Sequence, residues 1–373
     1  MKGSSERFIR CWWRQTDWNI SVSSLNCKTF TALRSGGLFF LPTARKEKEK
    51  RKMNIVGILI PWVLLIVGLV LLIKGADWFV DGASGLATRM RIPSLVIGMT
   101  IVAFGTSAPE AAVSITSALQ NNGGIAMGNV VGSNLFNLLM VVGGCAIIRS
   151  PQIDKAVIKK DFPYNILATV VLLFALLDVA LGDGTANVLS RTEGLIIIAF
   201  FSIFMYYTIV SAKSGKTETV EVEKKVNLGK LIVMLVVGIA AIITGGQAVV
   251  NGASDIARSF GVSETLIGLT IVAVGTSLPE LVTSLVAVRK GEDNIAIGNV
   301  VGSNVFNILF IIGIGATIRS ISVDNLIVID TVILLAISTL FYAYIAKKKT
   351  VSRPVGIVMV LAYVLYVIYA IVR

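Results

Sequence analysis

The chain has 373 residues, of which 55% are hydrophobic and only 15% are charged, and its mean hydropathy is +0.81. This composition indicates an integral membrane protein rather than a soluble domain. The sequence contains no histidine, which excludes histidine-based metal sites, serine–histidine catalysis and histidine proton relays. Its three cysteines do not have a metal-binding spacing.

The net charge of +12 is concentrated at the start of the chain. Residues 1–52 carry 12 Lys and Arg against 4 Asp and Glu, which leaves 22 against 18 for the remaining residues. A nucleic-acid partner is therefore not expected. The segment has no sustained apolar period and no signal-peptide core. We expect it to be a non-native or disordered N-terminal extension, with the native chain starting at Met53; the alternative is a basic, cytoplasmic, lipid-contacting tail.

After Met53, apolar segments recur that are long enough to cross a hydrocarbon layer of about 30 Å. We place them at 54–80, 93–118, 125–148, 163–181, 190–211, 230–256, 263–288, 295–318, 325–346 and 354–372. They predict an all-α integral membrane protein with ten transmembrane helices. We expect a first five-helix repeat over 53–210, a linker over 211–230 and a second five-helix repeat over 231–373.

The basic residues of the short loops predict the orientation of these helices. On the side reached after the first helix the loops hold 18 Lys and Arg, whereas the other side, without residues 1–52, holds 4. Short cytoplasmic loops carry the excess of Lys and Arg in membrane proteins. We therefore expect a multi-pass protein of the cell membrane with both ends of the ten-helix body outside and the 211–230 loop in the cytoplasm.

An internal repeat relates the two halves of the chain. A shift of 170 residues aligns GTSAPE at 105–110 with GTSLPE at 275–280, and GNVVGSNLFN at 128–137 with GNVVGSNVFN at 298–307. Over 93–150 and 263–320, 29 of 58 positions are identical. Because each half holds five helices, an odd number, the second copy enters the membrane from the opposite side. This predicts an inverted repeat whose broken helices meet near the midplane.

The GTSxPE motifs place a carboxylate in an apolar helix together with hydroxyl groups. An ionisable group at membrane depth is costly and is by default a functional candidate. Pro109 and Pro279 remove a backbone donor, which frees carbonyl oxygens one turn earlier. At helical spacing, Glu110 shares a face with Thr106, Ser107 and Ala103, and the second half repeats this arrangement.

The GNVVGSN motifs add amides and further hydroxyls to this set. Ser133 and Asn137 are four residues apart, as are Ser303 and Asn307, and the glycines permit close helix approach. Small-residue motifs of this kind are often packing surfaces, and this alternative applies to the GNVVGSN motif on its own. Taken with two glutamates, the oxygens match the six to eight ligands that Ca²⁺ prefers, and two carboxylates neutralise one such ion.

With these paired motifs the chain resembles the cation/calcium exchanger superfamily, of the sodium/calcium exchanger type, over essentially all of residues 53–373. The resemblance implies a non-enzymatic antiporter that exchanges Na⁺ for Ca²⁺ by alternating access, in which the long first and sixth helices slide against the others. It implies no cofactor and no obligate protein partner; the lipid bilayer and the two ions are the partners. The ligands it implies are Glu110, Glu280, Asn137, Asn307, Thr106, Ser107, Thr276, Ser277, Ser133, Ser303 and the backbone oxygens of Ala103 and Ala273.

One position departs from part of this family. Potassium-dependent relatives carry an aspartate at the position of Asn307, so the amide here favours a potassium-independent exchanger. A proton/calcium antiporter of the same fold and a passive cation channel are the alternatives. An intramembrane hydrolase using Ser107 or Ser277 would lack a histidine base, and neither motif contains a lysine.

Overall fold

The computed structural model describes residues 55–120, 122–182, 186–214, 227–262, 271 and 273–373. By internal contacts the chain divides into Met1–Lys52 and Met53–Arg373, and the second unit contains all of the described residues. The predicted extension at 1–52, the centre of the predicted linker and the start of the seventh predicted helix lie outside the described residues.

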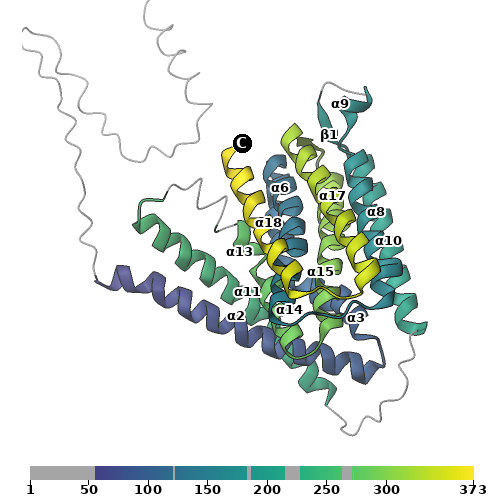
Figure 1. Cartoon of the computed structure of the whole chain (residues 1–373). Coiled ribbons are helices and arrows are strands. Elements are labelled where there is room, and N and C mark those ends of the chain that lie inside the picture. Colours follow the sequence, from purple (N-terminus) through teal and green to yellow (C-terminus); the bar gives the residue numbers. More distant parts are fainter. Residues whose placement is uncertain (1–54, 121, 183–185, 215–226, 263–270, 272) are drawn as a thin grey trace, which may run out of the picture. The chain divides into compact units, whose positions relative to one another are not determined.

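Helices make up nearly all of the described part of both halves (Figure 1). In the first half the elements are α2 Ile55–Met90, α3 Ser94–Ile97, η1 Gly98–Val102, α4 Ala103–Thr106, α5 Ala108–Leu119, α6 Gly123–Phe136, η2 Asn137–Val141, α7 Val142–Ile148, η3 Val157–Asp161, α8 Phe162–Phe174, α9 Asp178–Leu181, β1 Asn187–Leu189 and α10 Arg191–Ser214. In the second half they are α11 Leu228–Ser259, α13 Ala273–Thr276, α14 Leu278–Arg289, α15 Asp293–Val305, η5 Phe306–Ile312, α16 Gly313–Ile318, β2 Ile321–Val323, α17 Asn325–Lys348 and α18 Arg353–Val372. The η segments are π-helical turns that continue an adjoining helix.

Within the described residues, seven helices are long and apolar enough to cross a membrane. An eighth candidate is a bent pair, Ser94–Thr106 with Ala108–Leu119, whose axes differ by 53°. Two of the ten predicted helices do not meet this criterion. The fourth corresponds to η3 with α8, which ends at Phe174, seven residues before the predicted boundary, and the seventh begins among residues that are not described.

Burial separates central helices from peripheral ones. The apolar window of the Asp293–Ile318 helix is 94% buried inside the protein and that of Gly123–Ile148 is 72% buried, whereas that of Arg353–Val372 is only 11% buried. Large apolar side chains therefore cover the outer helices, as expected for a surface that faces lipid. The two central helices carry the GNVVGSN motifs, so the candidate site lies in the interior.

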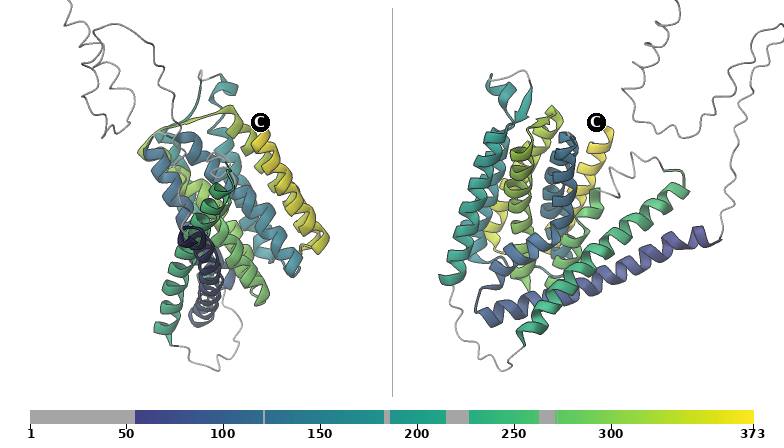
Figure 2. Two further views of the ribbon diagram at one scale, coloured as in Figure 1. Left: turned by 90° about the vertical axis from the view of Figure 1, so that its left-hand side faces the viewer. Right: turned by 180° about the vertical axis from the view of Figure 1, so that it is seen from behind.

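The long helices α2 and α11 pack along one another (Figures 1 and 2). Glycines permit this close approach. A Cβ added at Gly75 would lie 2.9 Å from the backbone oxygen of Gly238, and one added at Gly238 would lie 2.9 Å from the oxygen of Gly75. Contacts of this kind are typical of small-residue interfaces between membrane helices. The pair is the first and sixth helix of the predicted ten.

A short β-ribbon departs from the predicted all-α fold. Strands β1 and β2 pair antiparallel, with Val188 opposite Ser322. The amide of Asn187 supports the ribbon because its Nδ2 donates to Asn325 Oδ1 at 3.2 Å. Each strand has only three residues, which is too few for an alternating apolar pattern to be recognisable in the sequence. The ribbon joins the connections that precede α10 and α17.

Candidate cation site

Each GTSxPE motif lies where a helix breaks. Helix α4 ends at Thr106 and α5 begins at Ala108, with Ser107 between them in a non-helical conformation. Pro109 therefore occupies the first turn of a new helix, where no intrahelical N–H is required. The predicted interruption is present in both halves, but the proline begins a helix instead of lying inside one. The break also places Glu110 in the first turn of α5, where the helix dipole favours a negative charge.

The two carboxylates are fully buried and are bound across the halves. Glu110 is 1% exposed and Glu280 is 0% exposed. The Ser107 hydroxyl donates to Glu280 Oε1 at 2.8 Å, and the Ser277 hydroxyl donates to Glu110 Oε1 at 2.9 Å. The helical-face argument grouped Ser107 with Glu110 of its own half. In the folded protein each serine instead binds the glutamate of the other half.

Further hydroxyls extend these contacts. The Ser277 Oγ also forms a hydrogen bond with Ser133 Oγ at 3.0 Å, in which Ser277 accepts because its single proton is donated to Glu110, so Ser277 joins two groups of the first half. The backbone oxygen of Ala103 accepts from Thr106 Oγ1 at 3.3 Å and from Ser303 Oγ at 3.5 Å. The same oxygen accepts the Ser107 N–H at 3.0 Å, so this predicted ligand is already hydrogen-bonded. Close approach makes the contact with Ser303 possible, because a Cβ added at Gly302 would lie 2.8 Å from the Cβ of Ala103.

The predicted ligands Asn137 and Asn307 lie at the start of the π-helical segments η2 and η5 and are 0% exposed. Their amide nitrogens each donate to an asparagine oxygen of the other half: Asn137 Nδ2 to Asn304 Oδ1 and Asn307 Nδ2 to Asn134 Oδ1, both at 3.1 Å. Neither Asn134 nor Asn304 was among the predicted site residues.

A second pair of asparagines was also missed. Asn129 and Asn299 hold the helix that carries the glutamate of their own half and contact a threonine of the other half. Their bonds are Asn129 Nδ2 to Ser114 Oγ at 2.9 Å and to Glu110 O at 3.4 Å, Asn299 Nδ2 to Ser284 Oγ at 3.0 Å and to Glu280 O at 3.4 Å, Thr106 Oγ1 to Asn299 Oδ1 at 3.0 Å and Thr276 Oγ1 to Asn129 Oδ1 at 3.4 Å. The signal available in the sequence was that both motifs repeat these amides.

Four buried oxygen atoms of the predicted ligands have no hydrogen-bond partner within the described part of the chain. They are Glu110 Oε2, Glu280 Oε2, Asn137 Oδ1 and Asn307 Oδ1. Buried polar atoms are almost always paired, so four such acceptors in symmetric positions indicate a bound group that is a cation or a hydrogen-bond donor. A hard cation fits this set, because carboxylate and amide oxygens are its preferred ligands.

The structure brings most of the predicted residues together. Eleven of the twelve take part in hydrogen bonds that form three groups, and each group contains residues of both halves. The twelfth predicted residue, Ala273, is the first residue of α13. A cavity of about 460 Å³ adjoins both helix breaks and is lined by residues that include Pro109, Thr276, Pro279 and Gly246 of α11.

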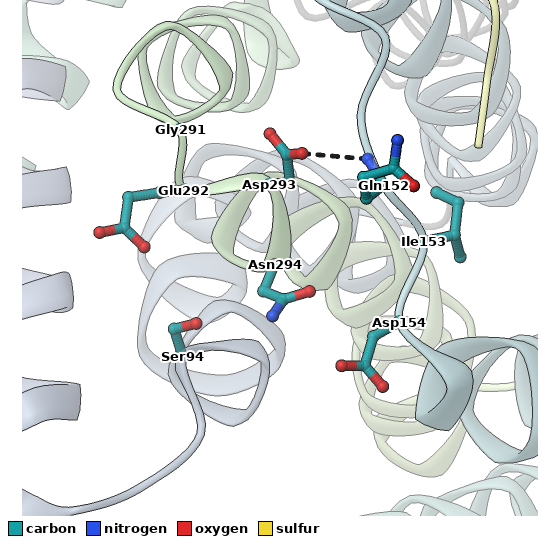
Figure 3. Close-up of a pocket in the computed structure, with 8 residues that line it drawn as sticks. All are labelled: Ser94, Gln152, Ile153, Asp154, Gly291, Glu292, Asp293 and Asn294. Carbon is teal, nitrogen blue, oxygen red and sulfur yellow. Dashed lines mark hydrogen bonds between the residues drawn. The ribbon is translucent and has the colours of Figure 1, made fainter. Parts of the chain in front are cut away.

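A separate polar cavity of about 310 Å³ lies beside the turn between α14 and α15 (Figure 3). It contains three carboxylates, and Glu292 points away from the other two. Each carboxylate already accepts a hydrogen bond: Asp293 from the backbone of Gln152 at 3.0 Å, Asp154 from that of Ala156 at 2.7 Å, and Glu292 from the Ser84 hydroxyl. Among the described residues, no group of three or more acidic, histidine or cysteine side chains could hold a metal ion. Two of these carboxylates thus link separate chain segments, through Ser84 and Gln152.

Comparison with known proteins agrees with the paired motifs. The sodium/calcium exchanger protein family matches residues 60–210 and 230–372. The chain is 33% identical to the sodium/calcium exchanger MaX1 of Methanosarcina acetivorans, over 83% of this chain and 98% of the relative, and 32% identical to the inner membrane protein YrbG of Escherichia coli, over 83% and 96%.

Among solved structures, the sodium-calcium exchanger NCX_Mj, soaked with 2.5 mM Na⁺ and 1 mM Sr²⁺, superposes with a TM-score of 0.72 at 30% identity. The superposition covers 83% of this chain and 98% of that one. Both halves of the repeat and both break-containing motifs lie inside the matched regions. The chain therefore belongs to the sodium/calcium exchanger family of multi-pass membrane antiporters.

Proposed function

We propose that the protein is a secondary active antiporter that exchanges Na⁺ for Ca²⁺ across the cell membrane by alternating access. One observation carries this proposal: two carboxylate oxygens and two amide oxygens are buried in symmetric positions without a hydrogen-bond partner in the described chain. Two glutamates supply a charge of −2, which balances one Ca²⁺. The names of MaX1, a sodium/calcium exchanger, and of NCX_Mj, a sodium-calcium exchanger, support the same pair of substrates.

The proposed ligands act in two ways. Glu110 and Glu280 supply the charge, while Asn137 and Asn307 supply neutral oxygens. The remaining ligands complete the coordination shell of the transported ion. They are the hydroxyls of Thr106, Ser107, Thr276, Ser277, Ser133 and Ser303 and the backbone oxygens of Ala103 and Ala273. The cavity beside Pro109 and Pro279 provides space through which an ion can approach the helix breaks.

We further propose ten membrane-spanning helices arranged as two inverted five-helix repeats, 53–210 and 231–373. The hydrogen bonds between Ser107 and Glu280 and between Ser277 and Glu110 support this arrangement. They are the same contact made twice, with the serine in one half and the glutamate in the other, as a two-fold relation between the halves requires. The distribution of Lys and Arg supports a cytoplasmic linker at 211–230 with both ends of the body outside. The packing of α2 against α11 through glycines suits a pair of helices that slide together.

Potassium independence follows from the charge of the proposed shell. The last residue of the repeated motif, GNVVGSNLFN or GNVVGSNVFN, is an asparagine in both halves, Asn137 and Asn307. The twelve proposed ligands therefore include no third fixed charge. The two carboxylates are matched by one Ca²⁺ or by two Na⁺, and no additional monovalent cation is needed for charge balance.

Calcium uptake into proteoliposomes under imposed gradients tests the proposal. Purified protein is reconstituted, and Ca²⁺ flux is followed with an outward Na⁺, K⁺ or H⁺ gradient. We expect uptake against a Ca²⁺ gradient with Na⁺ alone. Uptake driven only by H⁺ would identify a proton/calcium antiporter of the same fold. Flux that only dissipates the Ca²⁺ gradient would identify a passive channel and overturn the proposal.

A further inference from the structure

Two asparagines outside the proposed ligand set occupy equivalent places in the repeat. Asn134 and Asn304 are 170 residues apart and follow the serine of each GNVVGSN motif. Both side chains are fully buried, at 0% and 1% exposure. A buried amide must have its donors and acceptors paired, so the partners of these two groups show what the groups do.

Each of these amides accepts from a proposed ligand of the opposite half. Asn304 Oδ1 accepts from Asn137 Nδ2, and Asn134 Oδ1 accepts from Asn307 Nδ2, both at 3.1 Å. In addition, Asn134 Nδ2 donates to the backbone oxygen of Asn304 at 3.1 Å. The four residues therefore form a crossed amide pair that joins η2 and α15 with α6 and η5.

This pairing determines which atom of each ligand amide remains without a hydrogen-bond partner. A side-chain amide has an oxygen that only accepts and a nitrogen that only donates. Because the nitrogens of Asn137 and Asn307 are bound to Asn304 and Asn134, their oxygens are the ends without a partner in the described chain. If either ligand amide rotated by half a turn, an NH₂ group would take the place of its oxygen and would repel a cation.

We propose that Asn134 and Asn304 are positioning residues that hold the oxygens of Asn137 and Asn307 toward the transported cation. This inference rests on the proposed cation exchange, because it assigns a task to residues that do not themselves contact the ion. The acceptor on one half sets the orientation of a ligand on the other half. Both halves must therefore be packed together before either neutral ligand is oriented.

The sharpest test is a pair of changes at Asn304 and Asn137. Asn304→Leu keeps a similar side-chain volume but removes the acceptor for Asn137 Nδ2. Leaving a donor unpaired or letting the amide rotate is expected to raise the Ca²⁺ concentration for half-maximal uptake roughly five- to a hundredfold, with a smaller effect on maximal rate. Asn304→Gln keeps an uncharged amide acceptor and is expected to raise half-maximal Ca²⁺ less than Asn304→Leu does.

A double-variant cycle separates positioning from simple packing. If Asn304 acts through Asn137, then Asn304→Leu should have little further effect on half-maximal Ca²⁺ once Asn137→Ala has removed the ligand amide. Effects that multiply in the double variant, or equal losses in Asn304→Leu and Asn304→Gln, would overturn the proposal. Asn165→Leu, which removes a buried amide of α8 outside this set, is the control and should leave half-maximal Ca²⁺ unchanged.

A direct binding measurement keeps the inference distinct from the transport proposal. Ca²⁺-dependent thermal stabilisation of the detergent-purified protein requires binding but not exchange. If Asn304→Leu weakens this stabilisation while the parent protein fails to exchange Na⁺, the positioning role stands and the exchange proposal fails. If the parent protein exchanges and the variant binds Ca²⁺ as tightly, the positioning role is wrong. Should Asn304→Leu not fold, Asn134→Leu with Asn307→Ala gives the mirror-image cycle.

Discussion

The hydroxyl of Ser107 lies 2.8 Å from Oε1 of Glu280, although 173 positions separate the two residues in the sequence. The repeat contains the mirror contact, in which Ser277 donates to Glu110 at 2.9 Å. Each glutamate is thus paired by the half that does not contain it. A hydrogen bond that fixes one carboxylate oxygen leaves the other oxygen for a cation, so the proposed site is complete only when both halves are folded together.

Removing either serine hydroxyl should weaken Ca²⁺ binding by similar amounts. Hydrogen bonds to charged groups contribute about 1.5–3 kcal/mol, so Ser107→Ala and Ser277→Ala should each raise half-maximal Ca²⁺ about tenfold or more. Ca²⁺ uptake by proteoliposomes measures this change. Ser338→Ala is the control, because Ser338 is a buried serine of α17 whose hydroxyl has no partner within the described chain. A loss in one serine variant but not in the other would contradict the symmetric site.

Neutralising either carboxylate should nearly abolish exchange while the protein still folds. At a separation of about 4 Å and an effective dielectric of about 20, one unit charge contributes about 4 kcal/mol to the attraction of another, and a divalent ion loses more. We therefore expect Glu110→Gln and Glu280→Gln to lower Ca²⁺ flux by more than about a hundredfold. Glu193→Gln, at the start of α10, is the control. Near-normal flux in either site variant would exclude the proposed ligand set.

The duplicated motifs allowed the candidate ligands to be predicted from the sequence. Carboxylates and amides in apolar helices have few structural uses, and their repetition at a spacing of 170 residues made Glu110 and Glu280 recognisable without a structure. Seven helices and one bent pair were likewise predictable, because the length and composition of an apolar segment determine whether it can cross a membrane.

The contacts between the halves could not be predicted in the same way. Helical spacing relates residues of one helix, whereas Asn134 and Asn304 bind ligands on another helix that is far away in sequence. The boundary of the fourth helix was also misplaced. The predicted fourth helix begins at residue 163, whereas the π-helical turn that precedes α8 already ends at Asp161, whose charged side chain is only 2% exposed. Composition alone does not distinguish a buried charge from a solvated one.

Asn307→Asp should make the exchanger depend on an additional monovalent cation. The new carboxylate adds a third negative charge to the proposed site, and it cannot donate to Asn134 Oδ1 as the amide does. We expect Na⁺-driven Ca²⁺ flux in the variant to rise when K⁺ is added, whereas flux in the parent protein should not change. Asn137→Asp tests the same change in the other half. A parent protein that already requires K⁺ would show that potassium independence is wrong.

An ion pair outside the proposed site should stabilise a contact that has no charged equivalent in the other half of the repeat. Lys290, in the turn between α14 and α15, lies 2.7 Å from Asp81 and 3.1 Å from Asp77 of α2. By the 170-residue shift, the equivalent positions in the other half are Gln120, Gln247 and Asn251, which are uncharged. Helix α2 is therefore held to the turn between α14 and α15 by charged side chains, whereas the equivalent positions in the other half carry uncharged amides.

Lys290→Met should lower the free energy of unfolding by about 1 kcal/mol, because ion pairs that remain partly exposed contribute up to this amount. Burial alone would lower the pKa of Lys290, but hydrogen bonds with Asp81 and Asp77 outweigh this effect and raise it. A group whose pKa is raised by folding contributes its full stabilisation below its unfolded pKa, about 10.4 for lysine, and loses it as the pH rises through the folded value.

The stability difference between the parent protein and Lys290→Met should therefore be constant from about pH 6 to pH 9 and should shrink above about pH 10.4. It should also shrink as salt is raised, because partly exposed charges are screened. Thermal unfolding of the detergent-purified proteins measures both dependences, with Lys155→Met as a control at an exposed lysine before η3. A difference that is independent of pH and salt would mean that Lys290 stabilises the turn through the packing of its aliphatic stem and not through its charge.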